Sequence, residues 1–167
     1  MRYLVLLAGL VFLFSVSALD AQKSKTDFSG KWALNTEKSD LGDMSSGRRG
    51  GLPSSKLNVE QKDNMLMVES FRTNQDGVEE SMKSTYSLDG KECKNEGTNR
   101  SSVSTATWSE DGKLLTIISS VTMSRSGQEF SMKVNEVWSL AEGALSIKAT
   151  RTTQRGERTT TAVYNKS

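Results

Sequence analysis

Apolar and polar side chains alternate along the stretch from Gln128 to Leu140. Such a period of two is typical of a β-strand with one buried face and one face exposed to water. Glu136 is the one charged residue on the predicted buried face. The other members of that face are Phe130, Met132, Val134, Trp138 and Leu140.

Glu136 needs an explanation, because an unpaired carboxylate is costly to bury. Three arrangements would accommodate it: an ion pair with an inward-facing arginine, an interior that contains water, or a strand register displaced by one residue. Such a displacement would turn every side chain of the strand to the opposite face. An ion pair is the commonest of the three, since buried charged groups are usually paired.

Turn signals divide the rest of the chain into hairpins. Asp89-Gly90 and Asp111-Gly112 stand between alternating apolar runs, and Asp-Gly at such a place is a strong hairpin signal. No segment repeats apolar residues at helical spacing over three turns. The pattern predicts strands at 29–35, 56–62, 65–73, 78–88, 91–94, 101–109, 113–124, 128–140, 144–152 and 158–165, of which 91–94 has the weakest pattern.

Long strands in sequential antiparallel order, without protected edges, favour closure of the sheet on itself. We therefore expect an all-β fold, a single up-and-down antiparallel β-barrel of about 8–10 strands. Bulky apolar side chains gather at the end with the Asp-Gly turns, small ones in the middle and charged ones at the other end. This grading predicts a cup with a plugged end, a hollow middle and a polar mouth. The expected plug contains Trp32, Leu66, Tyr86, Leu88, Trp108, Leu115, Trp138, Leu140, Leu145 and Tyr164.

A ligand in this cup would contact residues at the mouth and on the inner faces of the strands. The long loop at 36–55, rich in Gly and Ser, is expected to lie over the mouth with Arg48 and Arg49. In the alternative interpretation the charged residues are solvated strand ends. Arg72 and Glu80, which flank one turn, would then pair with each other across it. The predicted ligand-binding residues are Arg72, Glu80, Trp108, Phe130, Glu136, Trp138, Arg151, Arg158 and Tyr164.

The first residues have the composition of a secretory signal peptide, with an almost uninterrupted apolar run from Leu4 to Val16. We expect a signal peptide at 1–18, with cleavage after Ala18 or alternatively after residue 21, and a polar leader at 19–27. A membrane anchor is the alternative, but the run is shorter than the roughly 20 apolar residues of a spanning helix. No Cys lies near the cleavage sites. We therefore expect a secreted or periplasmic protein without a lipobox cysteine and without a membrane span in the mature chain.

The composition argues against several classes of function. The 167 residues include no His, the commonest general base and metal ligand, and a single Cys, Cys93, which cannot form an internal disulfide. No acidic cluster has metal-ligand spacing, so we expect no enzyme, no metal and no cofactor. A formal net charge of +2 argues against nucleic acid as a partner. We expect one barrel domain at 28–167, as a monomer.

The opening strand carries a family resemblance. Phe28-Ser29-Gly30-Lys31-Trp32-Ala33-Leu34 resembles the F-x-G-x-W-x-L strand of the calycins, which include lipocalins and fatty-acid-binding proteins. The ending Tyr164-Asn165-Lys166 is similar to the Y-x-K close of fatty-acid-binding proteins, and the hairpins resemble those of secreted bacterial lipocalin-like proteins. The resemblance implies that Trp32 plugs the closed end and that Tyr164 faces inward. Ala162 departs from the pattern, because fatty-acid-binding proteins have there an Arg that holds the ligand carboxylate.

Two functions stay open at this point. The first is a carrier that binds a small apolar or amphipathic molecule inside the barrel, with an anionic head near the arginines of the mouth. The alternative is a non-enzymatic interaction module, protease-inhibitor-like or an envelope scaffold, with a filled core and with the leader from Lys23 to Asp27 as the contact segment. An interior packed solid by side chains would exclude the carrier.

Overall fold

The computed structural model of the chain describes residues 24–42, 53–74, 76–125 and 127–167. These residues form one 10-stranded antiparallel sheet. None of them belongs to a helix that could cross a membrane. The strands are β1 (Gly30–Asp40), β2 (Lys56–Lys62), β3 (Met65–Thr73), β4 (Glu79–Ser87), β5 (Cys93–Gly97), β6 (Arg100–Trp108), β7 (Leu115–Arg125), β8 (Gln128–Ala141), β9 (Ala144–Thr153) and β10 (Gly156–Lys166).

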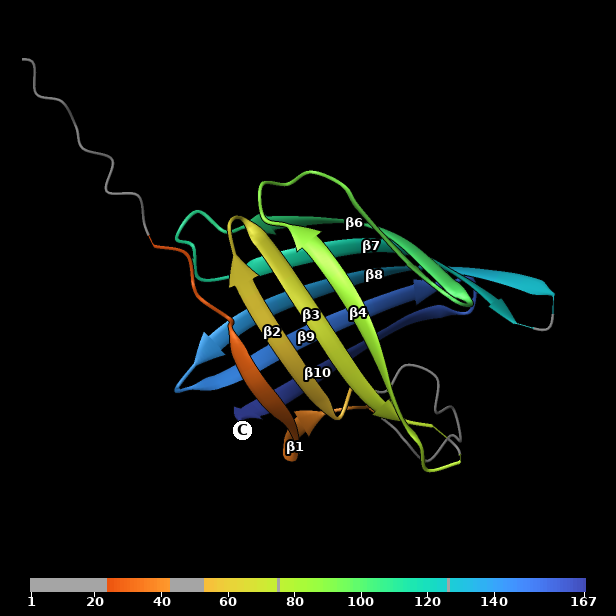
Figure 1. Cartoon of the computed structure of the whole chain (residues 1–167), viewed down its shortest axis with the longest axis horizontal. Helices are drawn as coiled ribbons and strands as arrows, with labels where there is room; N and C mark the ends of the chain where they lie inside the picture. The colour runs from red at the N-terminus through yellow and green to blue at the C-terminus, as the bar shows by residue number, and fades with distance from the viewer. Residues whose placement is uncertain (1–23, 43–52, 75, 126) are drawn as a thin grey trace, which may run out of the picture.

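The sheet curls into a nearly closed barrel, which confirms the predicted all-β architecture. Each strand pairs with the next along the chain except β4 with β5, and β1 pairs with β10. Figure 1 shows β2, β3 and β4 crossing in front of β7, β8 and β9. The strand order along the sheet is β4, β3, β2, β1, β10, β9, β8, β7, β6, β5, so the two edges that approach each other are β4 and β5.

The side chain of Asn95 bridges β4 and β5. The backbone N–H of Thr85 donates a hydrogen bond of 2.7 Å to Oδ1 of Asn95, and Nδ2 of Asn95 donates one of 3.0 Å to the Thr85 carbonyl. The Asn95 amide thus reproduces the pair of bonds that a neighbouring strand would make with Thr85. This bridge joins the two sheet edges at the one seam where the ladder is interrupted.

Two predicted boundaries are wrong. The first strand does not end at residue 35 but continues to Asp40, and its register with β10 shifts between Asn35 and Asp40. Within this irregular stretch the Ser39 hydroxyl donates to the Asn35 carbonyl at 2.6 Å and accepts from the Val163 N–H at 2.9 Å. Side-chain bonds therefore replace ladder bonds at the start of the 36–55 segment, whose Gly- and Ser-rich composition suggested a loop. The strand predicted at 91–94 is also displaced, because β5 runs from Cys93 to Gly97.

One end of the barrel is closed by an apolar plug, as the grading of side-chain size predicted. Phe28 lies at its centre with 0% of its surface exposed, stacked on Trp108 with ring centroids 5.7 Å apart. Its ring edge also meets Trp138, and its carbonyl accepts a 3.0 Å hydrogen bond from the Trp32 indole. Leu140 was predicted to be part of the plug but is exposed. The other buried members include Leu66, Leu88, Leu115, Leu145 and Tyr164.

The segment before β1 is held against the closed end. The Thr26 N–H donates a 2.9 Å hydrogen bond to the Gly112 carbonyl, and the Lys25 ammonium lies 5.7 Å from the Trp108 ring centroid. Gly112 has φ of +70°, and a Cβ built there would lie 3.2 Å from the Ser24 carbonyl oxygen. A side chain at position 112 would therefore displace the leader, so its described part is a structural element of the plug.

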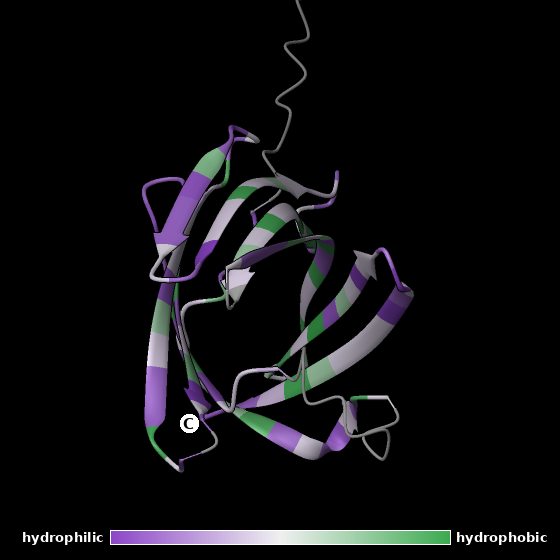
Figure 2. Cartoon of the chain, turned by 90° about the vertical axis from the view of Figure 1, so that its right-hand side faces the viewer, coloured by the Kyte–Doolittle hydropathy of each residue, from purple (hydrophilic) through white to green (hydrophobic). Residues whose placement is uncertain are grey.

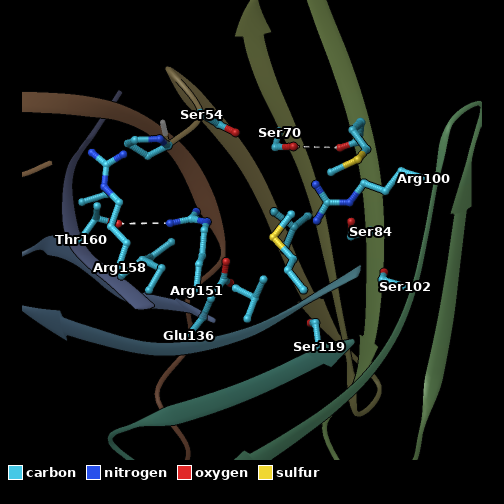
Figure 3. A pocket seen from close by; sticks show the side chains of 18 of the residues that line it. Ser54, Ser70, Ser84, Arg100, Ser102, Ser119, Glu136, Arg151, Arg158 and Thr160 are labelled. Carbon is cyan, nitrogen blue, oxygen red and sulfur yellow. Dashed lines mark hydrogen bonds between the residues drawn. The ribbon is translucent and has the colours of Figure 1, made fainter. Parts of the chain in front are cut away.

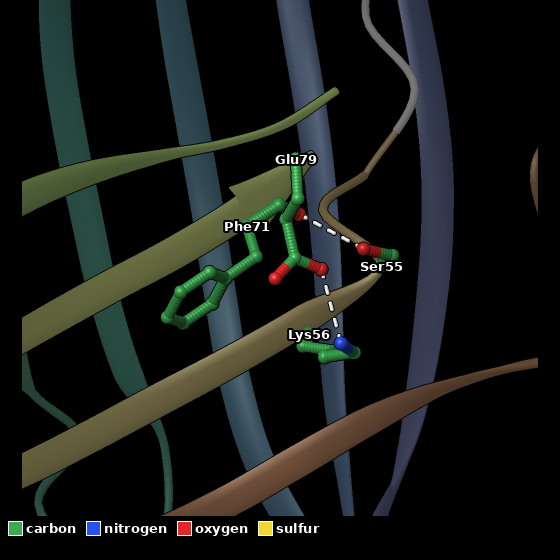
Figure 4. A network of polar contacts seen from close by, with 4 residues as sticks. All are labelled: Ser55, Lys56, Phe71 and Glu79. Atoms are coloured by element: carbon green, nitrogen blue, oxygen red, sulfur yellow. Dashed lines mark hydrogen bonds and ion pairs between the residues drawn. The ribbon is translucent and has the colours of Figure 1, made fainter. Parts of the chain in front are cut away.

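The chain enters β2 through a compact polar junction (Figure 4). Both the N–H and the hydroxyl of Ser55 donate to the Phe71 carbonyl, at 2.9 and 3.1 Å, and the Ser55 carbonyl accepts from the Leu34 N–H. Lys56 and Glu79 form an exposed ion pair of 3.0 Å between β2 and β4, which contributes about 0–1 kcal/mol to stability. The predicted signal peptide, its cleavage sites and the loop arginines Arg48 and Arg49 lie outside the described residues.

Candidate functional site

The barrel encloses a cavity of about 760 Å³. Figure 2 shows the strands arranged around the central space that this cavity occupies. Small side chains form the middle of its wall, as the sequence predicted, because Ser70, Ser84, Ser119, Ala149 and Ala162 all face it. A packed core would need larger residues at these positions. The interior is therefore hollow, which does not fit the filled core of the alternative prediction.

Arginines from several strands point into the cavity. Figure 3 shows Arg151 and Arg158 projecting from one side and Arg100 from the opposite side. Arg151 donates to the Thr160 hydroxyl at 3.2 Å and Arg158 to the Leu41 carbonyl at 2.7 Å. Arg72 also lines the cavity and donates from Nε to the Ser54 hydroxyl at 3.3 Å. Each of these partners is neutral, so these hydrogen bonds do not neutralise the positive charges.

The Arg100 guanidinium forms neither a hydrogen bond nor an ion pair with any residue that the structure describes. It projects from the first residue of β6, on the same face as Ser102. Arginine has five N–H donors that match carboxylate, sulfate and phosphate oxygens. Arg100 and Arg155 are thus the cavity arginines whose guanidinium donors have no partner among the described residues.

The arginines repel one another in a partly dehydrated space. Burial lowers the pKa of Arg72, and the positive charges of Arg100 and Arg151 lower it further. Burial likewise lowers the pKa of Arg151, while the Glu136 carboxylate opposes this and Arg100 and Arg158 add to it. A group that loses hydration and has like-charged neighbours is stabilised by an anion nearby. The charges that line the cavity therefore favour a negatively charged ligand over a neutral one.

Glu136 faces inward, so the register predicted for β8 is correct. Its Oε2 accepts a 3.1 Å hydrogen bond from the indole Nε1 of Trp138, and both side chains line the cavity. No arginine nitrogen lies within 4.0 Å of the carboxylate among the described residues, so the expected ion pair is not formed. Among the described residues neither an ion pair nor a register shift therefore accommodates Glu136, whose carboxylate instead faces the open cavity.

Two tyrosines complete the polar part of the cavity floor. Burial, followed by the nearby Glu136 charge, raises the pKa of Tyr86 to about 12. The pKa of Tyr164 is also raised, first by burial and then by Glu136. The Tyr164 hydroxyl donates a 3.1 Å hydrogen bond to the Ser54 carbonyl. Both phenols are therefore neutral donors near neutral pH, placed around a carboxylate.

A crystal structure of zebrafish ileal bile acid-binding protein complexed with cholic acid is similar to this barrel, with a TM-score of 0.53 and 16% sequence identity. The match covers 84% of this chain and 98% of that chain. The chain has a calycin-type β-barrel. No protein-family model matches the chain, and none of the curated proteins matches it.

In this calycin barrel six of the nine predicted ligand-binding residues line the cavity. Trp32 lies in the plug with 2% of its surface exposed, as the family resemblance implied. The six residues that face the cavity are Arg72, Glu136, Trp138, Arg151, Arg158 and Tyr164.

Three predicted positions need correction. Glu80 is exposed and accepts a 2.9 Å hydrogen bond from the Asn74 amide, so the turn rather than the cavity fixes it, and it forms no ion pair with Arg72. Trp108 stacks on Phe28 in the plug instead of facing the cavity. Phe130 has 46% of its surface exposed and lines a shallow hollow at the rim with Met123.

The sequence interpretation missed Arg100, although its signal was present. Arg100 lies two and four residues before Ser102 and Ser104, on the face that was already predicted to be internal. The strand was predicted to begin at residue 101, which left Arg100 outside it. Alternation continued by one more step would have placed this guanidinium in the calycin cavity.

Proposed function

We propose that this protein is a secreted or periplasmic carrier that binds a small amphipathic anion inside its barrel, without catalysing a reaction. The observation that carries the proposal is the cavity of about 760 Å³, which is lined by five arginines, Arg72, Arg100, Arg151, Arg155 and Arg158. Two carboxylates line the same cavity: Glu157 accepts a 3.3 Å hydrogen bond from the Thr152 hydroxyl, and Glu136 forms no ion pair with an arginine among the described residues. An anionic head would supply the missing negative charge.

The apolar part of the ligand would contact the wall between the arginines and the plug. Leu57, Val68, Val134 and Ile147 face the cavity there, together with the edge of Trp138. Burial of apolar surface contributes about 25 cal/mol per Å², before the cost of ordering the ligand. The affinity would thus come mainly from burial of the hydrocarbon portion of the ligand, and the arginines would mainly fix the orientation of the ligand.

The similar structure supports this proposal, because it is that of a bile acid-binding protein complexed with cholic acid. The described part of the leader argues against the role of contact segment, since Lys25 and Thr26 are held on the plug. Secretion is proposed from the apolar run at residues 4–16 alone.

Native mass spectrometry of the protein purified from its own host tests the proposal. We expect a retained small molecule that fragments as an anion, together with a chain that begins after residue 18 or 21. The proposal fails if the purified protein carries no bound small molecule and also does not bind anilinonaphthalene sulfonate, an amphipathic anion. Replacement of Arg100 by Ala should weaken the binding of that probe, whereas replacement of the exposed Lys148 by Ala should leave its binding unchanged.

A further inference from the structure

The free oxygen of Glu136 has a consequence for the choice of ligand. The carboxylate makes one hydrogen bond, from Trp138 to Oε2 at 3.1 Å, and Oε1 has no partner among the described residues. A carboxylate accepts up to about four hydrogen bonds. Because the side chain faces the cavity, a guest can supply the donor that the protein does not.

The arginines and Glu136 occupy different depths of the cavity. On β8, Glu136 pairs with Ala149, whereas Arg151 pairs with Val134, two residues nearer the mouth. Arg100 pairs with Met123, which pairs with Phe130, six residues before Glu136 along β8. Six residues of strand span about 20 Å. Arg100 is therefore nearest the mouth, Arg151 lies between, and the acceptor lies deepest, beside the plug.

We propose that Glu136 is a specificity-determining residue, which favours ligands with a hydrogen-bond donor, hydroxyl or ammonium, at the end opposite to their anionic group. This inference rests on the proposed function. The anionic group lies near the arginines, the hydrocarbon part spans the small residues of the middle, and the donor reaches Oε1 of Glu136. A plain acyl chain would instead place methyl groups against a carboxylate and strip it of water.

The indole of Trp138 positions the acceptor for this task. Its hydrogen bond fixes one carboxylate oxygen, and the ring itself is 2% exposed and packed against Phe28. The remaining oxygen is thus held in one orientation rather than free to rotate away. A rigid, partly buried acceptor discriminates against a guest that leaves it unpaired.

Isothermal titration of the full chain with three acids of equal length tests the inference: dodecanoate, its ω-hydroxy derivative and its ω-amino derivative. We expect the wild type to bind at least one of the two derivatives about 10-fold more tightly than dodecanoate. The hydroxyl and amino arms distinguish a neutral donor from a cationic one. Glu136→Leu should abolish the preference and strengthen binding of dodecanoate.

The exposed Glu129, on the outer face of the same strand, provides the matched control, and Glu129→Leu should leave the three affinities in their wild-type order. Glu136→Gln retains an acceptor and should keep part of the hydroxyl preference while losing that for the amine. The inference is overturned if Glu136→Gln and Glu136→Leu shift all three acids equally, or if wild type binds dodecanoate tightest. Failure of all three acids to bind the wild type would overturn the proposed function itself.

Discussion

The Trp138 indole donates a 3.1 Å hydrogen bond to the carboxylate of Glu136, two residues earlier on the same inner face of β8. Alternation along a strand brings such a pair to one side of the sheet at adjacent positions. The contact joins the apolar plug to the polar cavity, because Trp138 packs on Phe28 while Glu136 faces the arginines. The Trp138–Glu136 pair therefore lies at the boundary between the apolar and the polar parts of the interior.

A double-mutant cycle should show that this bond stabilises the fold. Trp138→Phe removes the donor and Glu136→Gln removes the charge of the acceptor. We expect a coupling free energy of unfolding of about 1–2 kcal/mol between the two substitutions, since the bond involves a charged acceptor. Urea denaturation of the four proteins measures it. Additive single-mutant effects would show that the contact contributes nothing beyond ring packing.

The two phenylalanines Phe28 and Phe130 make a matched pair for testing the plug. Phe28 is 0% exposed and Phe130 is 46% exposed. Phe28→Ala should lower the free energy of unfolding by about 3–5 kcal/mol through loss of burial and creation of a cavity. Phe130→Ala should lower it by less than about 1 kcal/mol. Equal losses would mean that the leader and Phe28 are not part of the folded core.

The strand pattern of this chain was readable from the sequence because it is local. The Asp-Gly turns and the period of two located the hairpins, and the alternation alone predicted that Glu136 lies on the inner face. The inward position of Glu136 needed no register shift, whereas the ion pair that was expected for it is not formed among the described residues. The gradient from bulky to small side chains similarly predicted the plug and the hollow above it.

Contacts between distant segments were not readable. The sequence does not show that Phe28 stacks on Trp108, 80 residues further along, because this depends on how the leader folds over the closed barrel. The same holds for Glu80, which was expected at the mouth but bonds to Asn74 within its own turn. Hydrogen bonds of the Ser39 side chain also extend β1 to Asp40, although the composition of 36–55 suggested a loop there.

The buried tyrosines should make the free energy of unfolding fall at alkaline pH. The native pKa of Tyr86 is raised to about 12 from an ordinary value of 10.0, and that of Tyr164 is raised as well. The unfolded chain therefore releases these protons first, and stability that is fully present below pH 10 is lost as the pH rises toward 12. Each group contributes a slope of at most about 1.4 kcal/mol per pH unit. Unfolding by urea at a series of pH values, with Tyr86→Phe for comparison, should show a smaller slope in the variant. A pH-independent free energy would contradict the burial of both phenols.

The seam between β4 and β5 should open when Asn95 is replaced. Asn95→Ala removes both bonds to Thr85, of 2.7 and 3.0 Å, and should speed hydrogen exchange along β4 and β5. The loss of stability should be about 1–2 kcal/mol. Asn135→Ala, on the exposed face of β8, is the matched control and should leave exchange at the seam unchanged. Unaltered exchange in Asn95→Ala would show that strand packing alone holds the two edges together.

The cavity arginines give the most direct test of the central claim, that the barrel binds an amphipathic anion. Isothermal titration should compare dodecanoate with its methyl ester, which has the same chain but no charge, on wild type, on Arg100→Ala/Arg151→Ala and on the exposed Lys148→Ala control. We predict that wild type and Lys148→Ala bind dodecanoate at least about 10-fold more tightly than the ester, because charge-assisted hydrogen bonds to arginine stabilise the anion. The double variant should bind the two equally. Equal affinities in the wild type, or a preference for dodecanoate that survives the loss of both arginines, would contradict it.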